Sequence, residues 1–325
     1  MSMRTILVTG GAGYLGSTLV PVLLARGHTV RVLDSLAVGD GSALLPVWGR
    51  DEFEFVAGDV RDESVRATAL AGVDAVVHLA AIVGDPACAR DPDLARLVNV
   101  DGTLALLEES RAAGVERFVF ASTCSNYGKL ADGDVFATEE WELRPVSLYA
   151  ETKVQAEVKV LAAAGSGFAS TCLRFATVYG AAPRMRFDLT VNEFARDALV
   201  TGQLVVYGEQ FWRPYVHVRD AARAVATVFD VPAEHVGGAV FNVGSTGENF
   251  RKRDLVEFLL ARLPETTVDR VARTEDPRDY RVSFEKIKST LGFVPARTVP
   301  QGIDEVLGLL RSGIVADPFD DRYRN

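Results

Sequence analysis

The sequence is poor in residues that build disulfide frameworks and metal centres. Its 325 residues include three cysteines, Cys88, Cys124 and Cys172, and four histidines. No cysteine belongs to a Cys-x-x-Cys pair or to the Cys/His spacing of a zinc site. We therefore expect neither a disulfide framework nor a bound metal, and this cysteine usage favours a reducing compartment, the cytoplasm.

Long hydrophobic runs are also missing. No segment reaches the roughly 18 uninterrupted apolar residues of a membrane-spanning helix. The N-terminal stretch MSMRTILVTGG has a basic residue and a short apolar run, but the run stops at Thr9-Gly10-Gly11, too early for a signal peptide. The sequence therefore predicts no membrane partner.

An excess of basic residues is absent as well. The 35 lysines and arginines are outnumbered by 44 acidic residues, which gives a net charge of −9. General binding to nucleic acid is therefore not expected, although a local basic cluster can still hold an anionic small molecule. Gly/Ser linkers and internal repeats are also lacking, so the regions of the chain should pack tightly together.

The sequence does contain a regular alternation of strands and helices. The predicted strands are 5–10, 29–34, 53–59, 75–81, 117–123 and 170–176, and helical patterns between them include 63–71, 93–113 and 149–164. This alternation predicts an α/β fold with a Rossmann-type, doubly wound parallel sheet. Beyond about residue 180 the pattern loosens into a smaller, mixed region with helices near 189–200, 218–231, 252–262 and 301–312. We therefore divide the chain into 1–180 and 181–325 and expect a ligand cleft between the two parts.

A glycine-rich turn, VTGGAGYLGS at 8–17, connects the first strand to the first helix. Gly10 and Gly11 permit a tight turn, Gly13 lets a ligand approach the backbone, and Gly16 lets the helix lie close to the strand. The N-terminus of the helix then offers free N–H groups and a positive dipole to a pyrophosphate. The turn therefore predicts a dinucleotide site.

Two aspartates follow the next two strands. Asp34 ends the second strand, where its carboxylate can accept both ribose hydroxyls of an adenosine and would repel a 2′-phosphate. Arg31 lies within the strand and is interpreted as structural, so the sequence favours NAD over NADP. Asp59, after the third strand, could reach the adenine amino group, and its alternative reading is a turn or helix-capping aspartate.

The segment SLYAETKVQAE, 147–157, places Tyr149 and Lys153 four residues apart in a predicted helix that Ser147 can cap. Residues at i and i+4 share a face, so both side chains can point into one site. Alone, this spacing describes an exposed tyrosine beside a solvated lysine. The other motifs of the chain decide between the two readings.

Motifs spread over residues 5–295 resemble those of extended short-chain dehydrogenases/reductases of the nucleotide-sugar epimerase/dehydratase family, and the chain is UDP-glucose 4-epimerase-like. The motifs are TGGAGYLG (9–16), HLAA (78–81), NVDGT (99–103), STCSNYG (122–128), YAETK (149–153), LRFATVYG (173–180), RPYVHVRD (213–220) and LGFVP (291–295). The resemblance implies that NAD is the cofactor, that a nucleotide-diphosphate sugar is the substrate and that the protein is a homodimer. It makes 1–180 the NAD-binding domain with the catalytic residues and 181–325 mainly the nucleotide-sugar-binding region.

The resemblance also assigns residues to the site. The implied catalytic residues are Thr123, Tyr149 and Lys153. The implied NAD-binding residues are Gly10, Gly13, Tyr14, Leu15, Gly16, Asp34, Asp59, Val60, Leu79, Ala80, Ala81, Asn99, Tyr149 and Lys153. The implied substrate-binding residues are Thr123, Cys124, Ser125, Thr177, Arg186, Asn192, Arg213 and Arg278. Asn99 should support the active-site backbone more than touch substrate, and His78 is interpreted as a hydrogen-bonded core histidine.

The chemistry of the catalytic residues follows from their charges. A free tyrosine, with a pKa of about 10, is a poor base at neutral pH. The Lys153 ammonium and the positive nicotinamide should lower the pKa of Tyr149, so that it removes the proton of a sugar hydroxyl while hydride leaves the same carbon. Thr123 would hydrogen-bond the reacting oxygen.

The chain departs from its relatives just after Thr123. Family dehydratases carry an Asp-Glu pair there, and decarboxylases of the family carry glutamate at the place of Ser125, whereas this chain has Cys124 and Ser125. The Cys124 thiol is either a base beside a sugar ketone or a small buried residue. Thr177 stands where many relatives have asparagine, which leaves the identity of the sugar open.

These features predict an NAD-dependent nucleotide-sugar epimerase that inverts C4 through a transient 4-keto sugar. The alternatives are a nucleotide-sugar 4-ketoreductase or dehydrogenase and, more remotely, a non-catalytic NAD sensor or scaffold. The intact set of Thr123, Tyr149 and Lys153 counts against the last alternative.

Overall fold

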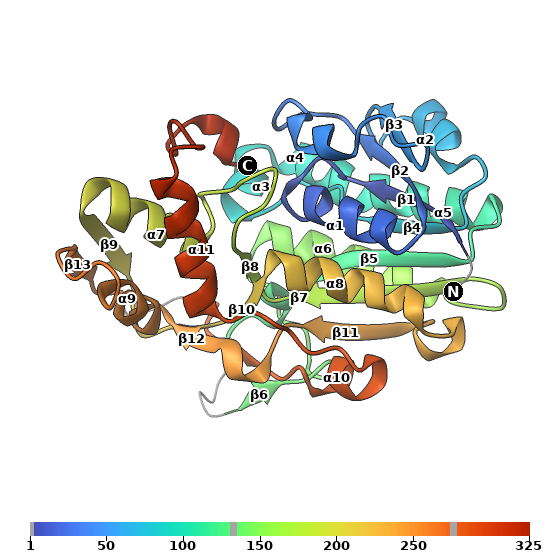
Figure 1. Cartoon of the computed structure of the whole chain (residues 1–325). Helices are drawn as coiled ribbons and strands as arrows, with labels where there is room; N and C mark the ends of the chain where they lie inside the picture. The colour runs from blue at the N-terminus through green and yellow to red at the C-terminus, as the bar shows by residue number, and fades with distance from the viewer. Residues whose placement is uncertain (1–2, 131–134, 274–277) are drawn as a thin grey trace.

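A seven-stranded sheet dominates the protein, shown as a computed structural model that describes residues 3–130, 135–273 and 278–325 (Figure 1). Every neighbouring pair of its strands is parallel, in the order β11-β7-β5-β4-β1-β2-β3. The strands are β1 (Thr5–Thr9), β2 (Thr29–Asp34), β3 (Phe53–Ala57), β4 (Ala75–His78), β5 (Arg117–Thr123), β7 (Ala169–Phe175) and β11 (Ala239–Val243). The predicted Rossmann-type α/β fold is confirmed.

The strand order reverses between β1 and β4. From β1 the chain builds outward through β2 to β3, and it then crosses to the other side of β1 to form β4. In open parallel sheets, ligands bind beyond the carboxyl ends of the strands at such a reversal. The glycine turn follows β1 directly, so the topology positions it at this point.

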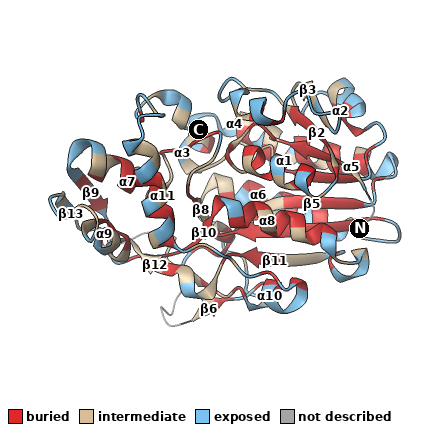
Figure 2. Cartoon of the chain, in the orientation of Figure 1, coloured by how far each residue is buried: buried red, intermediate tan, exposed pale blue. Residues whose placement is uncertain are grey.

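Helices cover both faces of the sheet. On one face α1 (Tyr14–Ala25) packs against α8 (Val218–Thr227), and on the other lie α2 (Glu63–Leu70), α5 (Thr103–Ala112) and α6 (Leu148–Ala162). Successive residues of β1 serve the two faces, because Ile6 packs in a cluster with Leu19 of α1 whereas Leu7 packs in a cluster with Val160 of α6. Figure 2 shows the strands buried between these helices.

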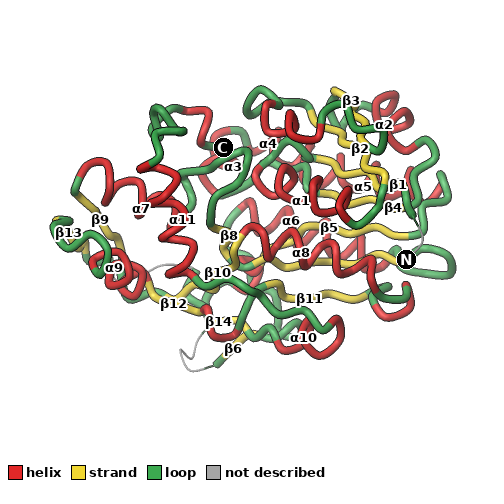
Figure 3. Tube along the Cα trace, viewed as in Figure 1, coloured by secondary structure: helices red, strands yellow, loops and turns green. Residues whose placement is uncertain are grey.

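A smaller region lies beyond the carboxyl ends of the strands (Figure 3). Its sheets are β8 (Thr177–Tyr179) with β10 (Trp212–His217) and β12 (Asn249–Arg251), and β9 (Gln203–Tyr207) with β13 (Thr267–Val271). Its helices are α7 (Thr190–Thr201), α9 (Lys252–Leu260) and α11 (Val299–Arg311). Their apolar residues form a core of their own.

Several short elements complete the fold. They are α3 (Asp85–Arg90), α4 (Pro92–Arg96), a π-helix (Leu97–Gly102), α10 (Glu285–Leu291) and the strand pair β6 (Phe136–Ala137) and β14 (Arg281–Val282). The single helix predicted at 93–113 is therefore α4, the π-helix and α5 in succession.

The sheet also takes elements from the second half of the chain. Strand β11 extends the sheet beside β7, and α8 packs on α1, although both follow residue 180. The division into 1–180 and 181–325 thus follows chain order, whereas in space the large layer includes parts of both. The sequence did not predict β11, because its five residues join the sheet only through pairing with a distant strand.

Within the ranges that the structure describes, no helix is long and apolar enough to cross a membrane. Groups of three or more side chains suited to hold a metal ion are not found in those ranges either.

Candidate active site

The glycine turn leaves no room for side chains. Gly10 has a φ of +70°, and a Cβ there would lie 2.8 Å from the backbone nitrogen of Ala80. A Cβ on Gly16 would overlap the carbonyl oxygen of Gly10. Gly13 caps α1 without a side-chain hydrogen bond, and the first turn of α1 contains no acidic residue. Free N–H groups in such a tight cradle fit the diphosphate of a dinucleotide.

Asp34 is fixed at the rim of this cradle. Its carboxylate accepts hydrogen bonds from the backbone N–H groups of Ala12 and Leu36, both at 2.9 Å. Arg31 donates to Glu54 and to two backbone carbonyls, which confirms its structural role. Asp34 is therefore the charged group at the carboxyl end of β2 that can select the ribose.

We expect NAD to bind more tightly than NADP, since the Asp34 carboxylate accepts from free ribose hydroxyls and repels a 2′-phosphate. Asp34→Asn keeps an oxygen that can accept from one backbone N–H but removes the negative charge. It should therefore reduce the ratio of NAD affinity to NADP affinity. Asp34→Ala should narrow it further and also loosen the glycine turn. Isothermal titration calorimetry with both cofactors measures the ratio of the two affinities, and equal or tighter NADP binding by the unmodified protein would refute this role for Asp34.

The neighbouring predicted cofactor residues line the same edge of the sheet. Leu79 and Ala80 lie against Gly10 just after the end of β4, and Ala81 follows them. Val60 is buried. Asp59 forms a two-pronged ion pair with Arg61, whose hydrogen bonds hold the pKa of the carboxyl below its usual range. An adenine contact from Asp59 stays a prediction.

Asn99 and His78 organise the backbone beneath the site. The buried Asn99 amide accepts from the Ile82 N–H at 2.8 Å and donates to the Ile82 carbonyl at 3.0 Å, as expected for a supporting residue. His78 lies between the hydroxyls of Thr9 and Thr103, and burial lowers its pKa to about 3. It is a hydrogen-bonded core histidine.

Helix α6 presents the tyrosine and the lysine. Ser147 caps the helix by accepting from the Ala150 N–H, as predicted. Lys153 is only 3% exposed, and its ammonium donates to the Ala121 carbonyl of β5 at 3.0 Å. The same ammonium lies over the ring of Phe120. The Tyr149 side chain is partly buried, and its hydroxyl makes no hydrogen bond to any residue that the structure describes. Lys153 is thus anchored, and Tyr149 is available to a substrate.

The predicted lowering of the Tyr149 pKa is not found in the protein chain by itself. Burial raises the pKa of Tyr149, Cys88 adds to the rise, and Arg186 opposes it. Burial also lowers the pKa of Lys153 to about 8, because a desolvated ammonium is costly. Lys153 points to a backbone carbonyl, so the chain alone does not make Tyr149 a stronger base.

Thr123 and Ser125 lie beside α6, at the end of β5. The Thr123 hydroxyl accepts from the Ser125 N–H at 3.1 Å, and the Ser125 hydroxyl lies 3.4 Å from that of Tyr280. Cys124 points the other way. Its side chain is 1% exposed, its thiol donates to the Arg174 carbonyl, and burial raises its pKa well above 9. This placement matches the buried reading of Cys124 and not the predicted substrate contact.

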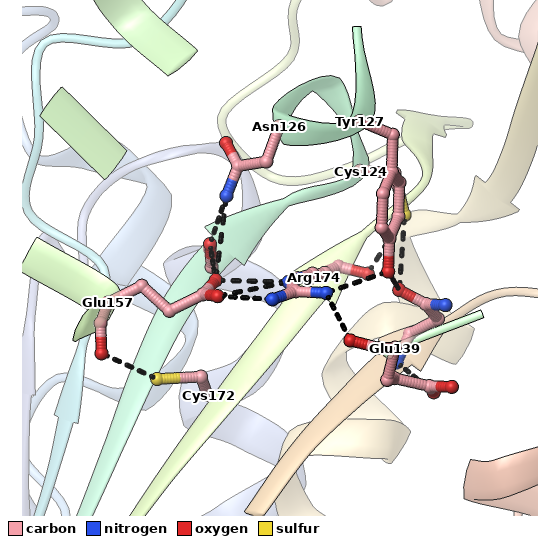
Figure 4. A network of polar contacts seen from close by, with 9 residues as sticks. Cys124, Asn126, Tyr127, Glu139, Glu157, Cys172 and Arg174 are labelled. Atoms are coloured by element: carbon pink, nitrogen blue, oxygen red, sulfur yellow. Dashed lines mark hydrogen bonds and ion pairs between the residues drawn. The ribbon is translucent and has the colours of Figure 1, made fainter. Parts of the chain in front are cut away.

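A buried polar network holds these elements together (Figure 4). Glu157, one turn beyond Lys153 on α6, accepts from Ser122 of β5 and from Arg174 of β7, with contacts of 2.5 Å to each. Arg174 also donates to the Tyr127 hydroxyl at 2.8 Å, and Tyr127 donates to Asn242 of β11 at 2.7 Å. The network fixes α6 against β5 and therefore sets Tyr149 and Lys153 against Thr123.

Three predicted arginines are partnered near the site. Arg186 makes a two-pronged ion pair with Asp188, and its charge acts on Tyr149. The Arg213 guanidinium lies 5.6 Å from the centre of the Tyr280 ring. A third pair joins Arg278 to Asp85 of α3 at 2.9 Å. Thr177 is partly buried in β8, next to β10, the strand that bears Arg213. These basic groups lie on the side of the smaller region.

Asn192 does not fit its predicted contact with a phosphate. Its side chain is fully buried, its oxygen accepts from the Gly180 N–H, and its nitrogen donates to the Arg186 carbonyl and the Tyr14 hydroxyl. The Tyr14 hydroxyl in turn donates to the Gly180 carbonyl at 2.6 Å. Both side chains tie α1 to the segment after β8, and Asn192 has no donor left for a ligand.

Three residues of the site escaped the sequence analysis. They are Asp85, Tyr280 and Arg184. Arg184 belongs to a visibly basic stretch, PRMRF, whereas nothing around Asp85 or Tyr280 distinguishes them from surface residues. Their membership depends on contacts between segments that are distant in the chain.

Comparison with known proteins agrees with this geometry. Residues 6–244 match the NAD dependent epimerase/dehydratase family. A UDP-glucose 4-epimerase of Corynebacterium glutamicum is 32% identical over 90% of this chain and 91% of its own length. The crystal structure of DesIV, a dTDP-glucose 4,6-dehydratase of Streptomyces venezuelae with NAD bound, superposes with a TM-score of 0.84, at 32% identity, over 95% of this chain and 97% of the other. MoeE5, solved with UDP-glucuronic acid and NAD, has a TM-score of 0.83 at 28% identity, over 95% and 100% of the two chains.

The fold, the glycine cradle and the Tyr149/Lys153 pair therefore define an NAD-dependent enzyme. The chain belongs to the NAD-dependent epimerase/dehydratase family and is an extended short-chain dehydrogenase/reductase with activity of the nucleotide-sugar epimerase/dehydratase type.

Proposed function

We propose that the protein is an NAD-dependent nucleotide-sugar epimerase that inverts C4 through a transient 4-keto sugar. The observation that carries the proposal is the absence of an acid–base pair after Thr123. Position 124 is a buried thiol held by a backbone carbonyl, and position 125 is a serine beside Tyr280. A buried thiol and a serine at these two positions support oxidation and reduction of the sugar without loss of water.

In this proposal the chain's residues act on the sugar hydroxyl at C4. Tyr149 accepts the proton of that hydroxyl and later returns it, and Thr123 donates a hydrogen bond to the reacting oxygen. Lys153 holds the nicotinamide ribose with an ammonium that the Ala121 carbonyl orients. Bound NAD supplies the hydride acceptor and donor, and its positive ring favours the phenolate form of Tyr149.

The substrate in the proposal is a nucleotide-diphosphate sugar. Arg186, Arg213 and Arg278 supply positive charge on the side of the smaller region, and a planar guanidinium suits diphosphate oxygens. Each is already in contact with a neighbouring side chain, so substrate would compete with or extend these pairs. A homodimer and a cytoplasmic location belong to the same proposal as expectations from the sequence.

The decisive experiment follows the hydride. With catalytic NAD and no added NADH, the enzyme should interconvert two C4-epimeric nucleotide sugars from a panel of UDP-, GDP- and dTDP-hexoses. Substrate deuterated at C4 should keep its label in the inverted product, as detected by mass spectrometry and NMR. Stoichiometric consumption or release of NADH would identify a ketoreductase or dehydrogenase instead. Loss of label to solvent together with inversion next to the ketone would indicate proton transfer at the carbon beside the ketone.

A further inference from the structure

The segment that carries Arg184 lies against the first turn of α1, next to the glycine cradle. Arg184 lies between β8 and α7, and its backbone N–H donates to the Ser17 hydroxyl in the first turn of α1 at 3.2 Å. The residue is 8% exposed. The segment after β8 is thus fastened to the N-terminal turn of the helix that faces the cofactor.

The Arg184 guanidinium is buried with only part of its hydrogen bonding satisfied. Its Nη2 donates to the Arg324 carbonyl at 2.7 Å. Its Nε and Nη1 atoms are buried and have no partner among the described residues. A buried donor without a partner loses its hydrogen bonds to water without replacement, and the cost is larger when the donor is charged. A charged group kept at such a cost indicates a role beyond packing.

The nearby carboxylates do not relieve this guanidinium. Asp188 is engaged with Arg186, and Asp34 with the N–H groups of Ala12 and Leu36. Burial lowers the pKa of Arg184, the Arg186 charge lowers it further, and the Asp188 and Asp34 charges act in the opposite direction. Arg184 therefore lies within electrostatic range of Asp34, the ribose-selecting residue at the rim of the cradle.

We propose that Arg184 binds the diphosphate of NAD through its Nε and Nη1 atoms. The ligand chemistry is that of a phosphate anion, because the donors are a fixed positive charge beside the free N-terminus of α1, where anions bind. The Arg324 carbonyl holds the guanidinium through Nη2, which leaves Nε and Nη1 for the ligand. The inference adds a cofactor ligand from the second half of the chain, and it holds whichever sugar reaction the enzyme performs.

Binding measurements on the full-length protein test the proposal. Arg184→Met should weaken NAD and ADP by about 10- to 100-fold, the scale of a charge-assisted hydrogen bond. Affinity for adenosine, which lacks phosphates, should change by less than about twofold. Isothermal titration calorimetry measures NAD and ADP directly, and competition with NAD measures adenosine. NAD and ADP affinities that remain within about threefold of wild type would overturn the proposal, as would equal weakening of adenosine.

Thermal stability separates ligand binding from a structural role. Without cofactor, Arg184→Met should unfold at the same temperature as the wild type or higher, because it removes a partly unsatisfied buried charge, and its stabilisation by NAD should be smaller. Arg184→Lys keeps the charge on a flexible stem and should recover part of the ADP affinity. Arg184 would have only a structural role if two results were found together. Arg184→Met would be less stable than wild type without cofactor, and Arg184→Lys would bind ADP like wild type.

Arg117 provides the matched control. It is also a buried arginine with an unpartnered Nε, but it begins β5, at the amino ends of the parallel strands and thus at the end of the sheet opposite to the glycine turn. Arg117→Met should leave the affinities for NAD and ADP unchanged. NADP is the remaining comparison, because an arginine that contacted a 2′-phosphate would lose NADP affinity on substitution and keep ADP affinity. That outcome would contradict the assignment to the diphosphate.

Discussion

Replacement of Tyr149 by phenylalanine should lower turnover by at least about a hundredfold, the lower end of what a positioned general base contributes. The substitution removes one hydroxyl, and that hydroxyl makes no hydrogen bond to the described parts of the chain. Folding and NAD affinity should therefore stay close to wild type. Steady-state kinetics with the substrate identified in the panel, together with calorimetry for NAD, measure the two quantities.

The control for this substitution is Tyr207→Phe, because Tyr207 is an exposed tyrosine on β9, far along the chain from α6. It should retain full turnover. If Tyr149→Phe kept turnover within a few-fold of wild type, another group would have to remove the proton. Weakened NAD binding by the same variant would show instead that the tyrosine acts mainly on the cofactor.

Arg174→Met should lower the free energy of unfolding by about 3–5 kcal/mol, the usual cost of removing one partner of a buried ion pair. The Glu157 side chain is 1% exposed and would lose the guanidinium that pairs with its carboxyl group. Tyr127 would lose a donor in the same network. Urea unfolding followed by circular dichroism measures the change, and Arg26→Met, which breaks a partly exposed pair with Asp230, should cost no more than about 1 kcal/mol.

A double-mutant cycle tells the ion pair from simple loss of packing. Glu157→Gln combined with Arg174→Met should be more stable than the sum of the single changes implies, because neither partner is left charged and unpaired. Strict additivity would show that the two groups do not interact energetically. Turnover of any folded variant should fall as well, since the network sets α6 against β5.

Much of the site was predictable from short stretches of sequence. The cradle requires glycine at Gly16 because a Cβ there would overlap the Gly10 carbonyl, and at Gly10 because of its positive φ and the nearby backbone of Ala80. The motif shows both glycines, but the contact with Ala80 is a tertiary one. The spacing of Tyr149 and Lys153 predicts a shared helix face, and Ser147 predicts where that helix begins. In the chain without NAD, burial raises the pKa of Tyr149 and Lys153 points to a backbone carbonyl, and both are tertiary properties. The lowering of the Tyr149 pKa in the presence of the nicotinamide stays a prediction.

The sequence by itself determined the sheet-forming alternation, the glycine turn and the helix that bears Tyr149 and Lys153, because each depends on residues that are neighbours in the chain. Only the tertiary structure decided that Cys124 faces the core and that the side chain of Asn192 makes all its hydrogen bonds within the chain. It also placed Arg184 against Ser17. Those outcomes depend on which distant segments meet and on how much water they exclude. Burial then sets which donors remain available to a ligand.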